Sequence, residues 1–100
     1  MGLNWFDAAK AKEFGNSLGD FFIQKIPVND SQTMDDKLFA RKTKKVLASM
    51  STQIVEFRRS NSLNIYKRAQ LSNAFKWTLK EAGYSNEYVN ELTMWLVRQL

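Results

Sequence analysis

Between residues 33 and 59, the side chains suited to a protein core recur every three or four positions. They are Phe39, Thr43, Val46, Leu47, Met50, Ile54 and Phe57. Successive helical residues are rotated by about 100°, so these positions share one side of a helix. Lys37, Arg41, Lys44 and Lys45 fall on the opposite side. The pattern predicts a long amphipathic helix whose apolar side other helices must cover, while its basic side faces water.

The N-terminal segment has the same periodicity. Steps of three and four residues connect Phe6, Phe14, Leu18, Phe21, Phe22 and Ile26. They predict a helix from about residue 5 to residue 26, with Asn4 as its N-cap and Asp7 in its first turn. Pro27 ends this helix. Residues 28–32 have turn composition, and Asp30 or Ser31 is placed to cap the long helix that follows.

Two more helices are predicted after a loop at residues 60–62. The first covers 63–82 and buries Leu71, Phe75, Leu79 and Ala82, and Gly83 is its C-terminal stop. Ser85 caps the second, over 86–99, which buries Val89, Leu92, Trp95, Leu96 and Leu100. Alternating strand patterns are absent from the sequence. We therefore expect one all-α domain over 1–100, a four-helix bundle-like fold with one long central helix and a C-terminal helical hairpin.

The chain contains neither histidine nor cysteine. An imidazole acid or base, a thiolate nucleophile, a zinc knuckle and a disulfide framework are therefore excluded. Besides the adjacent Asp35 and Asp36, the close carboxylate pair on one helical face is Glu87 and Glu91, which is typical of solvated charge. We expect no enzymatic activity, no cofactor and no metal site.

Hydropathy and charge indicate the cellular location of the protein. No stretch approaches the 18 or more apolar residues of a membrane span, and charged residues interrupt the N-terminal segment where a signal peptide would be apolar. We expect a soluble, cytoplasmic protein. Its net charge of +5 is concentrated in residues 31–62, where seven basic and three acidic side chains leave +4.

That basic excess defines the first candidate surface. Its members are Lys37, Arg41, Lys44, Lys45, Arg58 and Arg59. Cations arranged along a helix suit a phosphate backbone, so sequence-nonspecific nucleic-acid binding is one hypothesis. The alternatives are an ordinary solvated helix face and, less favoured, docking on anionic lipid.

The second candidate surface is apolar and aromatic. Tyr66, Gln70, Asn73 and Trp77 share the helix side opposite Leu71 and Phe75, as expected of a protein interface. Because a four-helix bundle covers more than one side of some helices, we expect the N-terminal helix to pack on this side and bury Tyr66 and Trp77. If it does not, the side suits a protein interface or, less favoured, the stacking of nucleic-acid bases.

Gly15 and Gly19 form a small-residue stripe that allows close approach of another backbone, and we count them with the possible protein interface. The alternative is that they are simply weak points in their helix. Our leading hypothesis is association with another protein or with a second copy as a homodimer, and nucleic-acid binding is the alternative.

Overall fold

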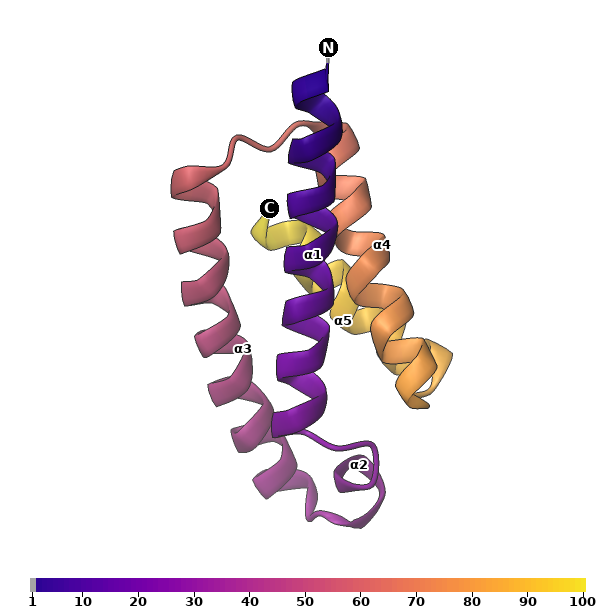
Figure 1. The fold of residues 1–100 in the computed structure, drawn as a ribbon. Helices are drawn as coiled ribbons and strands as arrows, with labels where there is room; N and C mark the ends of the chain where they lie inside the picture. The colour runs from indigo at the N-terminus through magenta and orange to yellow at the C-terminus, as the bar shows by residue number, and fades with distance from the viewer. Residues whose placement is uncertain (1) are drawn as a thin grey trace.

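The computed structural model describes residues 2–100, and the side chains of residues 8–100. Within these residues the chain forms helices and turns and no strand. The helices are α1 (Gly2–Lys25), α2 (Asp30–Thr33), α3 (Asp36–Ser60), α4 (Ile65–Ala82) and α5 (Asn86–Gln99) (Figure 1). Because α2 is a single turn, the four long helices confirm the predicted all-α bundle-like fold.

Helices α1 and α4 form the closest pair in the molecule. Their backbones approach at Gly15, where an added Cβ would lie 2.2 Å from the carbonyl oxygen of Leu71. At Gly19 an added Cβ would lie 2.7 Å from Cγ2 of Thr78. The interpretation of these glycines as a close-approach stripe is therefore confirmed, and the approaching backbone is α4 of the same chain.

Helices α4 and α5 form the predicted C-terminal hairpin. Gly83 ends α4 in the left-handed region, with φ of 105°, and donates its N–H to the carbonyl of Lys80. Ser85 then caps α5 by accepting the N–H of Tyr88 at 3.2 Å. From this turn, α5 crosses behind α4 and α1 in the view of Figure 1. Both turn residues act as the sequence predicts.

Helix α3 lies alongside α1 with a wider backbone separation than α4 has, and large side chains fill the space between them. The rings of Phe14 and Phe57 stack with centroids 4.2 Å apart and planes 6° apart. Nearer the start of α3, the ring of Phe39 lies beside the ring of Tyr88, with 6.2 Å between the two centroids. The buried residues of the helix are Val46, Met50 and Ile54. These contacts confirm the predicted apolar side of the long helix.

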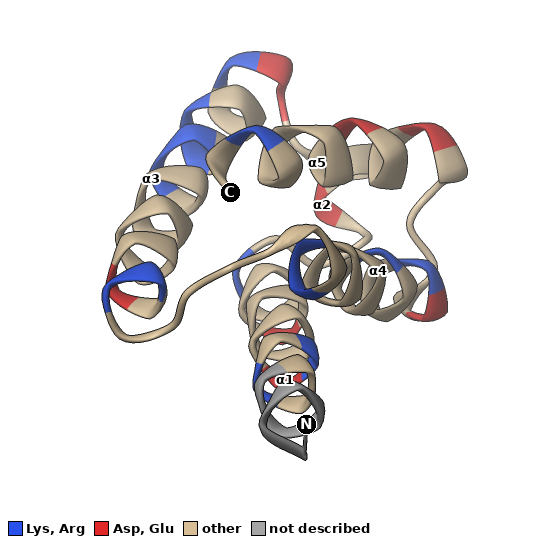
Figure 2. Cartoon of the chain, turned by 90° about the horizontal axis from the view of Figure 1, so that it is seen from above, with Lys and Arg blue, Asp and Glu red and all other residues tan. Residues whose placement is uncertain are grey.

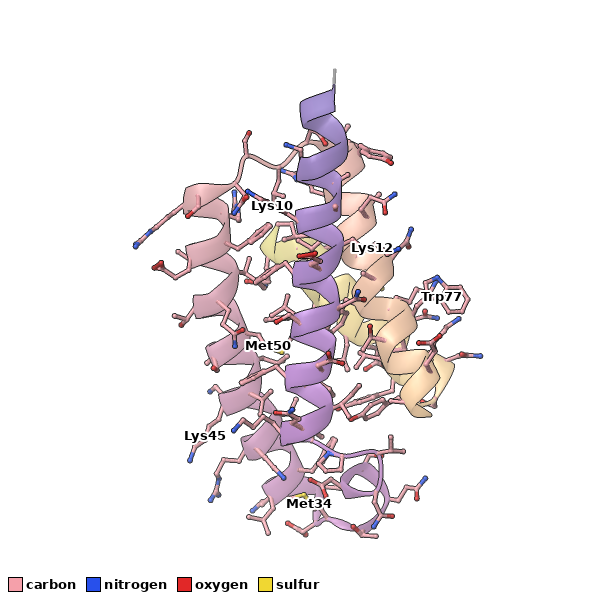
Figure 3. All side chains as sticks on the ribbon, in the orientation of Figure 1. Lys10, Lys12, Met34, Lys45, Met50 and Trp77 are labelled. Atoms are coloured by element: carbon pink, nitrogen blue, oxygen red, sulfur yellow. The ribbon has the colours of Figure 1, made fainter. Side chains whose placement is uncertain are left out.

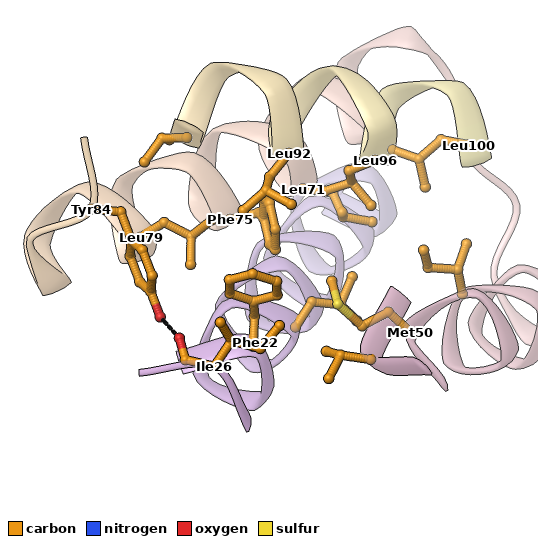
Figure 4. Close-up of a cluster of buried hydrophobic side chains, with 14 of the residues drawn as sticks. Phe22, Ile26, Met50, Leu71, Phe75, Leu79, Tyr84, Leu92, Leu96 and Leu100 are labelled. Atoms are coloured by element: carbon orange, nitrogen blue, oxygen red, sulfur yellow. Dashed lines mark hydrogen bonds between the residues drawn. The ribbon is translucent and has the colours of Figure 1, made fainter. Parts of the chain in front are cut away.

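The core lies where α1, α4 and α5 meet α3 (Figure 4). Its largest fully buried side chains are Phe22, Phe75, Leu18, Ile26, Met50, Ile54, Leu71, Leu79, Leu96 and Val89. Tyr84 closes one end of this cluster, where its hydroxyl donates a hydrogen bond to the carbonyl of Ile26. Burial of these side chains is the main force that holds the helices together.

The start of α3 differs from the prediction. The cap is Asp35, whose carboxylate accepts the N–H groups of Lys37 at 3.2 Å and Leu38 at 3.4 Å. The predicted caps were wrong because residues 30–33 form the separate turn α2. Asp30 instead pairs with Lys42, and the Ser31 hydroxyl donates to the carbonyl of Val28 at 2.9 Å.

The starts of two other helices also differ from the prediction. Helix α4 begins at Ile65, two residues later than predicted, because Asn64 accepts the N–H of Lys67 at 2.8 Å and acts as the cap. Helix α1 already begins at Gly2, ahead of the predicted cap at Asn4. The side chains of Asn4, Phe6 and Asp7 lie outside the described residues.

Candidate functional site

One side of α4 remains uncovered by the other described side chains. Helix α1 packs against the side of α4 that carries Leu71 and Thr78, and α5 packs against another side. On the remaining side, Tyr66 is 59% exposed and Trp77 is 57% exposed. Figure 3 shows Trp77 directed away from the bundle. The prediction that the N-terminal helix covers these aromatics is wrong, because the glycines of α1 bring it against a different side of α4.

The exposed side has a regular pattern. We define the α4 seam as Tyr66, Gln70, Asn73, Trp77 and Lys80, which follow one another in steps of four, three, four and three residues. Such steps keep side chains on one line along a helix and are the spacing of helices that pair with other helices. The Lys80 ammonium lies 5.1 Å from the centroid of the Trp77 ring. Asn73 is exposed, and Gln70 and Lys80 are half-buried.

A shallow hollow lies beside the Tyr66 end of this seam. It has a volume of about 270 Å³ and is lined by Ala8, Ala9 and Lys12 of α1 together with Tyr66 and Gln70 of α4. The sequence did not predict that α1 contributes to this surface. The two adjacent alanines were the available signal, but periodicity does not reveal which helix lies next to Tyr66. The prediction that Gly15 and Gly19 belong to a protein interface is wrong, because both glycines are buried against α4 of the same chain and offer no surface to a partner.

The first half of α3 carries the basic face, which we define as Lys37, Arg41, Lys44 and Lys45. All four side chains are exposed, and Figure 2 shows Lys and Arg concentrated in this part of the helix. They extend over about 12 Å at 1.5 Å per residue. None of the four makes an ion pair with another residue whose side chain the structure describes.

Arg58 and Arg59 do not belong to the same surface. They follow Lys45 by about 20 Å along the helix axis. Arg58 donates to the carbonyl of Gln99 at 3.3 Å, and Arg59 pairs with Glu56 at 3.2 Å. The structure thus brings four of the six predicted cations together and separates the other two.

Two further concave regions flank α3. A hollow of about 350 Å³ beside the basic face is lined by Met34, Leu38, Arg41, Lys42 and Lys45. At the opposite end, an open crevice of about 470 Å³ has Phe14 and Phe57 among its walls. Neither region holds a nucleophile paired with a base. In the described part of the chain, no group of three or more Asp or Glu side chains is placed to hold a metal ion.

Two phenols in the core have raised pKa values. Burial raises the pKa of Tyr84 to about 12, and the nearby Tyr88 and Asp30 add to the effect. Burial also raises the pKa of Tyr88, whose hydroxyl is buried near that of Thr43. Neither of those two hydroxyls has a hydrogen-bond partner of ordinary length among the described side chains. Both phenols are protonated at neutral pH, so they serve the core rather than proton transfer.

Comparison of the chain with known protein families, with curated proteins and with solved structures gives no match. Between residues 2 and 100, no helix has the length and hydropathy that a membrane crossing requires. The α4 seam with its hollow and the basic face of α3 are the two surfaces on which function can be argued. Of the two, the α4 seam exposes the larger apolar groups.

Proposed function

We propose that this chain is a non-catalytic binding module that recognises another polypeptide helix through the α4 seam. The observation that carries the proposal is the exposure of Tyr66 and Trp77, about three helical turns apart on one line. Tyrosine and tryptophan combine a large apolar body with a polar tip, and they dominate the energetics of protein interfaces. Two such residues on the open side of a packed helix favour a docking surface.

The middle of the α4 seam supports the same conclusion. Gln70 and Asn73 lie between the aromatics and offer amide donors and acceptors, which can satisfy polar groups of a partner. The helix beneath them is held by α1 on one side and α5 on another. A partner would therefore dock on a surface that is already ordered, which lowers the entropic cost of association.

A photo-crosslinking experiment tests the proposal. The photoreactive residue p-benzoylphenylalanine replaces Trp77 in one variant and Met94 in a matched control, because both side chains are 57% exposed. In cells that express the chain, we expect a polypeptide adduct of defined mass from position 77 and none from position 94. The adduct, identified by mass spectrometry, should decrease strongly when Tyr66→Ala is added. Equal adducts from both positions, or none from position 77, would contradict the proposal.

Nucleic-acid binding is the second candidate, supported by the four exposed cations on the basic face of α3, none of which forms an ion pair with a described side chain. If each contacts one phosphate of a duplex, the logarithm of the affinity should fall with the logarithm of salt concentration with a slope of about −3 to −4. Fluorescence anisotropy with a labelled duplex measures this slope. Lys44→Glu with Lys45→Glu should abolish binding, whereas Arg59→Glu should weaken it far less. No binding at low salt would exclude this function.

A further inference from the structure

We infer that the helix bound at the α4 seam is α4 of a second copy of this chain, running antiparallel about a two-fold axis. The inference rests on the proposed function, since it names the partner of the same surface. Its basis is that the steps from Tyr66 to Gln70, Asn73 and Trp77 are four, three and four residues. The order of steps is the same in both directions along the helix. When a second α4 runs antiparallel, each of these four positions therefore faces one of the same four positions in the partner.

The match pairs chemically suitable side chains. With the axis between positions 71 and 72, Tyr66 lies opposite Trp77 of the second copy, and Gln70 lies opposite Asn73 of the second copy. The symmetry makes each contact twice, as in an isologous dimer. Aromatic pairs at both ends bury apolar surface, and the amides between them exchange hydrogen bonds. No side chain of the inner four carries a charge that the pairing would bury.

The hollow beside the seam fits this register. It lies at the Tyr66 end, where the antiparallel arrangement brings Trp77 of the second copy. Ala8, Ala9 and Lys12 line the place where this large ring would lie, and the two small alanine side chains leave room for it.

Charge also distinguishes the antiparallel from the parallel arrangement. A parallel pair would bring Lys80 against Lys80 of the second copy, and such like-charge contacts oppose association. In the antiparallel register, position 80 lies opposite position 63, which separates the two Lys80 residues by roughly 25 Å along the axis at 1.5 Å per residue. That distance exceeds the screening length of about 8 Å at physiological ionic strength.

The contact is small, because one helix face supplies most of it. Interfaces that bury less than about 1,200 Å² are typical of weak, transient association. The oligomeric state must therefore be measured by sedimentation equilibrium from micromolar concentrations into the high micromolar range. We expect a monomer–dimer equilibrium that Trp77→Ala weakens about tenfold or more. Met94→Ala, at an equally exposed position on α5, should leave the dissociation constant unchanged.

Disulfide trapping tests the direction of the helices, because the natural chain has no cysteine. A tagged Gln70→Cys variant is mixed with Asn73→Cys and oxidised gently, and Lys80→Cys is oxidised separately. The inference predicts a mixed disulfide between positions 70 and 73 in several-fold excess over either symmetric one, and no dimer from Lys80→Cys. Asn90→Cys, exposed on α5, is the control that should not cross-link. Circular dichroism verifies that each variant is folded.

The outcomes separate this inference from the proposed function. Symmetric disulfides at positions 70 and 80 would show a parallel pair, which overturns the antiparallel inference and leaves the docking surface intact. A strict monomer whose position 77 still captures a different protein would overturn the second copy as partner, but not the proposed function. A strict monomer without adducts at position 77 would overturn both.

Discussion

A methyl group at the Cα of Gly15 would lie 2.2 Å from the carbonyl oxygen of Leu71, so the α1–α4 contact has no room for a side chain at this point. The same contact sets the rotation of α4. Because α1 lies against the side that carries Leu71 and Thr78, Tyr66 and Trp77 are turned toward solvent. The glycines of one helix thus determine which residues of the other are available to a partner.

We expect Gly15→Ala to destabilise the protein by about 1–3 kcal/mol, because the added methyl group meets backbone rather than a movable side chain. In an exposed helical position the same change would stabilise by about 1 kcal/mol. Urea denaturation measures the difference. Ser17→Ala, at an exposed position of α1, is the control and should be neutral or slightly stabilising. A neutral or stabilising Gly15→Ala would show that the two helices can separate at little cost.

The stacked rings of Phe14 and Phe57 should attach the C-terminal end of α3 to α1. Each change to alanine is expected to reduce the free energy of unfolding by about 2 kcal/mol, less than for a fully buried phenylalanine because both rings are half-buried. A double-mutant cycle should give a coupling of about 0.5–1.5 kcal/mol. Phe57→Leu keeps much of the apolar volume and is the control. Additive single effects would mean that the two rings contribute independently.

The pKa of Tyr84 predicts a loss of stability at alkaline pH. Its folded value of about 12 lies above the ordinary value of 10, so the unfolded chain loses the proton first as the pH rises. The stabilisation that the protonated Tyr84 hydroxyl gives the folded state is therefore complete below pH 10 and lost as the pH approaches 12. At about 1.4 kcal/mol for each unit of pKa difference, the loss in free energy of unfolding amounts to roughly 3 kcal/mol.

Tyr84→Phe isolates this effect. At pH 8 the variant should be less stable than the natural chain by about 1 kcal/mol, because the hydrogen bond to the Ile26 carbonyl is lost. The difference should shrink and then change sign between pH 10 and 12. Denaturation at a series of pH values measures it. Tyr88→Phe should be neutral or stabilising at pH 8, since that buried hydroxyl has no hydrogen-bond partner of ordinary length among the described side chains. A difference independent of pH would contradict the prediction.

Asp35 should stabilise the start of α3 by satisfying two backbone N–H groups. We expect Asp35→Ala to reduce the free energy of unfolding by about 1 kcal/mol, and Asp35→Ser to restore most of the loss. The neighbouring Asp36→Ala is the control, with an expected effect of about 0.5 kcal/mol from the helix dipole alone. Chemical denaturation at low ionic strength distinguishes the two. Equal losses at both positions would argue against a specific capping role for Asp35.

Part of the candidate site was evident before the structure. The spacing of Tyr66, Gln70, Asn73 and Trp77 placed them on one side of a helix, and that side is exposed. The exposure itself was not predictable, because a four-helix bundle can cover more than one side of a helix. Likewise, Arg58 and Arg59 lie on the same helix as the basic face. That Arg58 contacts Gln99 and Arg59 contacts Glu56 is known only from the structure.

The order of residues along the chain determined the four long helices, the turn at Gly83 and the apolar side from Phe39 to Phe57, because all of these depend on contacts within one or two turns of backbone. The tertiary structure decided which helix lies against which side of α4, and therefore that Tyr66 and Trp77 meet solvent while Gly15 and Gly19 do not. That choice depends on how closely two backbones can approach in space. Periodicity along the chain carries no information about that distance.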